Sequence, residues 1–197
     1  TPDTYSDGSV LHASIPHLSL AAYGVWHPDR SLHHTPLTDH ECNYTLQQQD
    51  CFVNDSGQLH KGIGLFNISS SYATSSTRME LLGALISLLK HQPIHLASDS
   101  SAFLTTVQRI HHNPHLPPPK PWKITIDGDL WSLFHDLLRH RDQDSTRFTK
   151  VKGHAAEADI NAGNISRRDV AGNSCADQLA KSAWRRAEPG QLQWHHF

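Results

Sequence analysis

Hydrophobic and polar positions along the chain follow two periods, one typical of strands and one typical of helices. Short runs that hold branched and aromatic residues predict strands over residues 18–26, 62–69, 94–98 and 147–151, and residues 5–9 predict a short strand that runs into a turn at Gly8. The first three strands have no predicted helix between them, whereas the last two alternate with helices. This order predicts a mixed α/β sheet with helices on its faces.

Apolar spacing and end signals predict the helices. Residues 78–91 form an almost wholly apolar helix, with a capping box from Thr77 to Glu80 and a stop at Pro93. Because its apolar residues lie on nearly all sides, we expect it to be buried against the sheet. Further helices are predicted from Ser100 to about His112, over 130–141 with Asp129 as the cap, and over 173–187.

Residues 28–60 show neither period and are rich in His, Gln, Asp and Asn. Connections usually have about 4–6 residues, so this segment is predicted to be a long loop or an insertion. Residues 113–121 are rich in proline and are predicted to form an extended connection. A length of 197 residues predicts one domain, spanning 1–197, that carries long insertions.

The composition excludes several classes of protein. The chain has 37% hydrophobic and 18% charged residues and a net charge of −2, which excludes disordered, collagen-like and coiled-coil chains. The longest apolar stretch, residues 81–89, is too short to span a bilayer, so no membrane partner is expected. The chain opens with Thr1, its only methionine is Met79, and no leader pattern is present. We expect a segment of a longer polypeptide or a processed product.

Cysteine usage indicates a reducing compartment. Three cysteines cannot form a disulfide framework, and no CxxC spacing occurs. The Asn67 sequon falls in a predicted strand, so we expect an intracellular protein, cytoplasmic or nuclear, and not a secreted one. Zinc is not expected in residues 28–60, because Cys42 and Cys51 lack the compact spacing of zinc ligands.

Four carboxylates lie where predicted strands or helices meet loops: Asp7, Glu80, Asp99 and Asp177. Each has an ordinary structural interpretation when taken alone. Asp7 suits a turn beside Gly8, and Glu80 completes a capping box. Asp99 and Asp177 suit the N-terminal ends of helices.

The same carboxylates belong to motifs that follow one another along the chain as Asp7-Gly8-Ser9, Thr77-Arg78-Met79-Glu80, Ser98-Asp99-Ser100, Val151-Lys152-Gly153-His154, and Gly172-Asn173 with Ala176-Asp177. This series resembles the type 1 ribonuclease H family, including the RNase H domains of retroelement and reverse transcriptase polyproteins. Asp129-Leu130-Trp131 resembles the start of the family's penultimate helix. The resemblance covers the chain from Tyr5 to about Ala187.

The resemblance implies a five-stranded mixed sheet, the first three strands antiparallel and the others parallel, with helices on both faces. Asp7 would project from the central strand and Asp99 from the end of its neighbour, with Glu80 and Asp177 arriving from helices. Two Mg²⁺ or Mn²⁺ ions among these carboxylates would flank a scissile phosphate. The implied activity is hydrolysis of the RNA strand of RNA/DNA hybrids, which leaves 5′-phosphate and 3′-hydroxyl ends.

The resemblance also implies roles for residues around the carboxylates. His154 follows Val-Lys-Gly, where family members carry a mobile histidine, so it is assigned an auxiliary role in proton transfer or product release. Recognition of RNA depends on shape and on the 2′-hydroxyl. The expected substrate contacts are Gly8, Ser9, Ser75, Ser76, Thr77 and Asn173.

The chain departs from the family's pattern in three places. It has an insertion at residues 28–60, a stretch at 155–171 that is longer than usual in the family, and few basic residues in the proline-rich connection before Asp129. Many members grip the hybrid with a basic helix before the helix that starts at Asp129, but here only Lys120 and Lys123 follow Arg109. We therefore expect weak binding by the isolated chain and help from a fused or associated reverse transcriptase. Two alternatives are a non-catalytic module of the same fold and another nuclease of the wider superfamily.

Overall fold

The computed structural model describes residues 1–11, 13, 19–53, 58–69, 75–90 and 93–186. Its strands are β1 (Thr4–Leu11), β2 (Leu20–Pro28), β3 (Leu46–Val53), β4 (Gln58–Ser69), β5 (Ile94–Ser98) and β6 (Thr146–Lys150). Its helices are α1 (Asp39–Tyr44), α2 (Ser76–Leu88), α3 (Ser101–His112), α4 (Gly128–His140), α5 (Glu157–Asn161) and α6 (Arg167–Arg186). Short 3₁₀ turns are η2 (Trp122–Ile124) and η3 (Gln143–Ser145).

The strands form one mixed sheet, which in the described residues has the order β3-β4-β2-β1-β5-β6. Neighbours from β3 to β1 pair antiparallel, whereas β1, β5 and β6 are parallel. The sequence-based prediction of a mixed sheet with an interior first strand is confirmed. The expected number of five strands is wrong, because β3 adds a sixth strand along the outer edge of β4.

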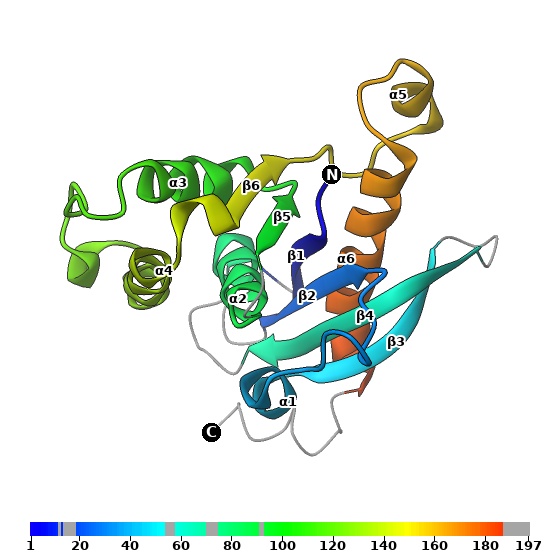
Figure 1. Cartoon of the computed structure of the whole chain (residues 1–197), viewed down its shortest axis with the longest axis horizontal. Coiled ribbons are helices and arrows are strands. Elements are labelled where there is room, and N and C mark those ends of the chain that lie inside the picture. Colours follow the sequence, from blue (N-terminus) through cyan, green and yellow to red (C-terminus); the bar gives the residue numbers. More distant parts are fainter. Residues whose placement is uncertain (12, 14–18, 54–57, 70–74, 91–92, 187–197) are drawn as a thin grey trace.

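Helices cover both faces of the sheet, as predicted (Figure 1). Successive side chains of a strand point to opposite faces, so β1 contributes to two layers. Tyr5 belongs to the core beneath α6, whereas Ser6 lies against Gly83 of α2. Gly24 of β2 lets α6 approach closely, since a Cβ there would lie only 2.6 Å from the backbone nitrogen of Ala180.

The described part of the segment 28–60 contains regular structure, so the alternative of a long loop is wrong for it, and the alternative of an insertion remains. It holds α1 and β3, and β4 begins four residues before the predicted strand. A helix of six residues is too short to show a helical period, and the register of β3 shifts between Gln49 and Cys51. The buried ion pair between Arg30 and Glu41, with 2.7 Å between Nη1 and Oε1, fastens α1 to the preceding loop.

The starts of α2 and α4 differ from the predicted ones. Ser75 caps α2, because its Oγ accepts a hydrogen bond from the backbone nitrogen of Arg78 at 3.0 Å. The predicted capping box from Thr77 is therefore wrong, and Glu80 is left to reach toward the sheet. Asp129 does not cap α4 either, because its carboxylate pairs with Arg78.

The stretch 155–171 contains α5 and the first turn of α6, which begins at Arg167 and not at Asn173. The hydroxyl of Tyr5 donates a hydrogen bond of 2.7 Å to Oδ1 of Asp169 and so ties the start of α6 to β1. The predicted end of this helix, at residue 187, lies outside the described residues. Within the described ranges, no helix is both long enough and apolar enough to cross a membrane.

Candidate metal centre

Asp7, Glu80 and Asp99 come together and are termed the carboxylate cluster. One oxygen from each lies within 4.8 Å of the others. Asp7 stands on β1 two residues beyond its last pairing with β5, and Asp99 directly follows the end of β5. The carboxyl ends of neighbouring parallel strands meet at one edge of a sheet, which is where sites in open α/β sheets lie.

Gly8 brings Glu80 to this edge. A Cβ on Gly8 would lie 2.6 Å from the Cβ of Met79 and 2.9 Å from the backbone nitrogen of Glu80. Only a residue without a side chain therefore allows the first turn of α2 to pack so closely on β1. The backbone nitrogen of Gly8 also donates to Asp7 Oδ1 at 2.7 Å and lies 3.3 Å from Glu80 Oε1.

The electrostatics of the cluster disfavour the charged carboxylates. Burial, and then the negative charges of Asp99 and Asp177, raise the pKa of Asp7 to about 7. Burial, and then the charges of Asp7 and Asp99, hold the pKa of Glu80 well above its usual range. In the described part of the chain, no Lys, Arg or His side chain forms an ion pair with the three.

A divalent cation fits this set of side chains. Carboxylate oxygens are hard donors of the kind that Mg²⁺ and Mn²⁺ prefer. A cation among them would offset both the burial of the charges and their mutual repulsion. The fit rests on the donor atoms and on the raised pKa values of Asp7 and Glu80.

Asp99 is half-buried against β6, the turn that follows β6, and α6. A Cβ on Gly153 would clash with Asp99 Oδ2, and Lys150 Nζ donates to the Asp99 backbone oxygen at 2.7 Å. Asn173 Nδ2 lies 3.4 Å from Asp99 Oδ2. Asn173 is buried and its Oδ1 has no hydrogen-bond partner within the described structure. The residue predicted to contact substrate thus lies directly beside the cluster.

Asp177 is close to the cluster but lies outside it. Its Oδ2 accepts a hydrogen bond of 2.7 Å from Lys181 Nζ, one turn further along α6. Its charge nevertheless contributes to the raised pKa of Asp7. Three of the four predicted carboxylates are therefore brought together, and the fourth is paired with a lysine.

His154 occupies an exposed turn after β6. Its backbone has a φ of 48°, in the left-handed region, and it follows the Gly153 that packs on Asp99. The backbone nitrogen of Val151 donates to the Ser98 oxygen at 3.1 Å, which extends the β5–β6 pairing toward this turn. His154 is thus carried on the same segment that encloses Asp99, with its side chain in solvent.

The other predicted substrate contacts lie on β1 and around the first turn of α2. Ser9 is half-buried in β1, Ser76 is exposed and Thr77 is half-buried. Ser75 already has an intramolecular role as the cap of α2. Its hydroxyl also lies 3.4 Å from Asp127 Oδ2.

Two residues near the cluster were not identified from the sequence. Ser98 donates a hydrogen bond to Glu80 Oε2 at 3.1 Å, and Lys181 pairs with Asp177. The position of Lys181, four residues after Asp177 on a predicted helix, was a signal for this pair. The sequence holds no pattern that predicts the contact between Ser98 and Glu80, because it joins two different elements, β5 and α2.

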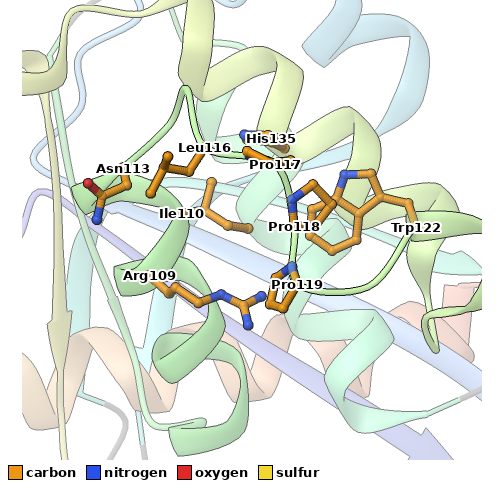
Figure 2. A pocket seen from close by; sticks show the side chains of 9 residues that line it. All are labelled: Arg109, Ile110, Asn113, Leu116, Pro117, Pro118, Pro119, Trp122 and His135. Carbon is orange, nitrogen blue, oxygen red and sulfur yellow. The ribbon is translucent and has the colours of Figure 1, made fainter.

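A pocket lies away from the carboxylates, between the end of α3 and the proline-rich connection (Figure 2). Its lining comprises Arg109, Ile110, Asn113, Leu116, Pro117, Pro118, Pro119, Trp122 and His135. His135 Nε2 lies 2.7 Å from the Pro114 backbone oxygen, a hydrogen bond that fastens the connection to α4. The connection is therefore packed on its neighbouring helices and forms no part of the candidate centre.

Comparisons with known proteins bear on the family and the fold of the chain. The family model for RNase H matches residues 50–185, a range that includes Glu80, Asp99 and Asp177. The chain is similar to LC9-RNase H1, a type 1 RNase H with the type 2 active-site motif, with 16% identity and a TM-score of 0.53 over 96% of this chain and 76% of that chain. It is also similar to a foamy viral protease-reverse transcriptase in complex with dsDNA, with 15% identity and a TM-score of 0.53 over 91% of each chain.

A search of curated proteins finds no match. At such low identities the two structures show a shared fold. Together with the family match, they confirm the RNase H-like α/β fold that the sequence motifs indicate.

Proposed function

The chain belongs to the RNase H family, and from this premise we propose that it is a metal-dependent endonuclease that hydrolyses the RNA strand of RNA/DNA hybrids. The observation that carries the proposal is the carboxylate cluster, whose oxygens lie within 4.8 Å of one another. The products of such a reaction would carry 5′-phosphate and 3′-hydroxyl ends.

The residues of the cluster would hold Mg²⁺ or Mn²⁺, with two ions required for the reaction. Asp7, Glu80 and Asp99 offer the first set of oxygens, and Asp177 would add its own on release from Lys181. Bound divalent cations supply Lewis acidity toward a phosphate and lower the pKa of an attacking water. Gly153 leaves room for the Asp99 carboxylate, and Asn173 Nδ2 lies 3.4 Å from Asp99 Oδ2, which would help to orient Asp99 as a ligand.

The residues around the cluster suggest how an RNA strand would be placed. The hydroxyl groups of Ser9, Ser76 and Thr77 lie on β1 and at the N-terminal end of α2, where backbone N–H groups and the helix dipole favour phosphate. Discrimination of RNA from DNA would depend on hydrogen bonds to the 2′-hydroxyl. His154 has an exposed side chain on a turn beside Asp99, which suits an auxiliary role in proton transfer or product release.

The test is a cleavage assay with an RNA/DNA hybrid labelled on the RNA strand. Wild-type protein would be incubated in Mg²⁺ and separately in Mn²⁺, with duplex RNA and duplex DNA as comparison substrates. Asp7→Asn removes a carboxylate of the cluster. Asp136→Asn, on the exposed side of α4, is the matched control.

We expect cleavage of the hybrid alone, its loss in Asp7→Asn and its retention in Asp136→Asn. Hybrid binding without cleavage by folded wild-type protein in either metal would contradict the proposal and would favour a non-catalytic module of the same fold. Cleavage of duplex DNA or duplex RNA in preference to the hybrid would favour another nuclease of the wider superfamily.

We also propose that the chain depends on an attached or associated domain, such as a reverse transcriptase, for tight binding. Phosphate contacts dominate affinity for nucleic acid, and the chain has a net charge of −2. The connection between α3 and α4 adds only Lys120 and Lys123 after Arg109. A fluorescence titration of the isolated chain at physiological salt is expected to give a Kd of about 10⁻⁴–10⁻⁶ M, the non-specific range. Nanomolar binding would contradict this proposal.

A further inference from the structure

Ser98 is the last residue of β5 and is fully buried. Its neighbour Ala97 belongs to the core beneath α6, so Ser98 points to the opposite face, toward α2. That direction brings its hydroxyl to Glu80, a residue that is itself only 3% exposed. A polar group in such a position must find its partners within the protein.

The hydroxyl of Ser98 makes two hydrogen bonds, and together they fix its direction. Oγ accepts a hydrogen bond from the backbone nitrogen of Ser100 at 3.1 Å. Oγ donates its own proton to Oε2 of Glu80, also at 3.1 Å. A hydroxyl has one proton to donate, so the amide contact is compatible with donation to Glu80.

These two bonds connect separate parts of the carboxylate cluster. Ser100 belongs to the turn that carries Asp99, and it caps α3 through its own side chain. Glu80 comes from the first turn of α2. The hydroxyl of Ser98 therefore joins the turn around Asp99 to the carboxylate of Glu80 across the gap between a strand and a helix.

We propose that Ser98 is a positioning residue of the metal centre, which sets the affinity for the cation by holding Glu80 at a fixed place relative to Asp99. This inference rests on the proposed metal-dependent function. Groups that hydrogen-bond to a ligating carboxylate orient it, and their loss weakens metal binding. Glu80 Oε1 has the backbone nitrogen of Gly8 at 3.3 Å, a longer contact, so Ser98 makes the shorter of these two hydrogen bonds.

The test measures Mn²⁺ binding to the metal-free chain by titration calorimetry, which needs no catalysis. Ser98→Ala removes the hydroxyl, and Ser98→Thr keeps it. Ser87→Ala is the matched control, because Ser87 is an equally buried serine whose hydroxyl donates to the Gly83 backbone oxygen within α2, at 2.8 Å, and not to the carboxylate cluster. Urea unfolding of each metal-free variant at one pH separates an effect on folding from an effect on the ion.

We expect Ser98→Ala to bind Mn²⁺ about 10–100-fold more weakly than the wild type. Ser98→Thr and Ser87→Ala should bind Mn²⁺ as the wild type does, although Ser87→Ala loses stability comparable to that lost by Ser98→Ala. Equal Mn²⁺ affinity in the wild type and Ser98→Ala would overturn the positioning role and leave the metal site intact. No Mn²⁺ binding by the wild type would overturn the proposed function together with this inference.

Discussion

Two groups of acidic side chains flank the first turn of α2, and they differ in whether a cationic side chain pairs with them. Asp127 and Asp129 share Arg78, whose guanidinium lies 3.2 Å from Asp127 Oδ1 and 2.6 Å from Asp129 Oδ2. The carboxylate cluster has no such ion pair within the described residues. The hydrogen bond from Arg78 lowers the pKa of Asp129 to about 2, whereas burial raises that of Asp7 to about 7.

The comparison shows that charged Asp127 and Asp129 stabilise the fold, whereas the charged carboxylates of the cluster destabilise it. Where the chain supplies a cationic side chain, the carboxylates are stabilised in their charged form. Where it supplies none, the charged form is disfavoured relative to a carboxylate in water, and a cation from solution would offset this cost. Raised pKa values of this kind cluster at functional sites, which is why we propose the carboxylate cluster as a site for a divalent cation.

The largest expected effect is on cleavage. Glu80→Gln removes a charge from the cluster, and loss of metal-ion stabilisation worth several kcal/mol should lower the rate of hybrid cleavage by about 10³-fold. Asp129→Asn, which changes the other acidic group, should cleave at the wild-type rate. Single-turnover rates on a labelled hybrid would measure both. An equal loss of cleavage rate in Glu80→Gln and Asp129→Asn would contradict the distinction between the carboxylate cluster and the acidic group paired with Arg78.

Breaking the paired group should affect stability. Arg78→Met leaves Asp127, whose side chain is only 6% exposed, without its cation. Loss of one partner of a buried pair should reduce the free energy of unfolding by about 3 kcal/mol, measured by urea denaturation at pH 7. Asp129→Asn should have a much smaller effect, because that side chain is 62% exposed. A loss below 1 kcal/mol for Arg78→Met would show that the pair contributes little.

Neutralising a carboxylate of the cluster should have the opposite effect and raise the free energy of unfolding. A carboxyl with a raised pKa in the folded state binds its proton more tightly there, so folding is penalised once it ionises. For Asp7 this penalty is absent below pH 3.8, grows as pH rises and is complete above about pH 7. Asp7→Asn should therefore raise the free energy of unfolding of the metal-free protein at pH 8 by about 2–4 kcal/mol, the upper figure corresponding to the full shift of the Asp7 pKa.

The pH dependence supplies the control for that prediction. The gain from Asp7→Asn should disappear below about pH 4, which a series of urea denaturation curves in the presence of a chelator would show. A gain that is the same at pH 4 and pH 8 would mean that it comes from packing and not from charge.

The smallest expected effect concerns Asp177. Lys181→Met removes an exposed ion pair at a spacing of one helical turn, which should change the free energy of unfolding by about 0.3–0.5 kcal/mol. Freed from this pair, Asp177 should strengthen Mn²⁺ binding by about twofold in titration calorimetry. Weaker Mn²⁺ binding in Lys181→Met would indicate that the lysine supports the centre.

The sequence predicted the elements that carry the cluster because their signals are local. A strand that carries Asp7 and Gly8, an apolar helix and a second buried strand place Asp7, Glu80 and Asp99 at one sheet edge. The helix start at Ser76 was misplaced because both Ser75 and Thr77 are suitable caps, and only the packing around Gly8 selects between them.

The remaining features depend on contacts between distant parts of the chain. β3 is defined as a strand by its pairing with β4, since its residues Gln47, Gln48 and Gln49 show no alternation of apolar and polar side chains. The hydrogen bond from Ser98 to Glu80 and the ion pairs of Arg78 likewise join elements that only the fold brings together. Such contacts have no periodic signature in a single sequence.

We propose that the carboxylate cluster is a site for a divalent cation. The most direct test is the free energy of unfolding of wild type and Asp7→Asn at pH 8, measured along a series of Mg²⁺ concentrations. At 100 times the Kd, Mg²⁺ should stabilise the wild type by about 2.7 kcal/mol and leave Asp7→Asn almost unchanged. A wild-type free energy of unfolding that stays constant along the whole series, or one that rises equally in Asp7→Asn, would contradict the claim.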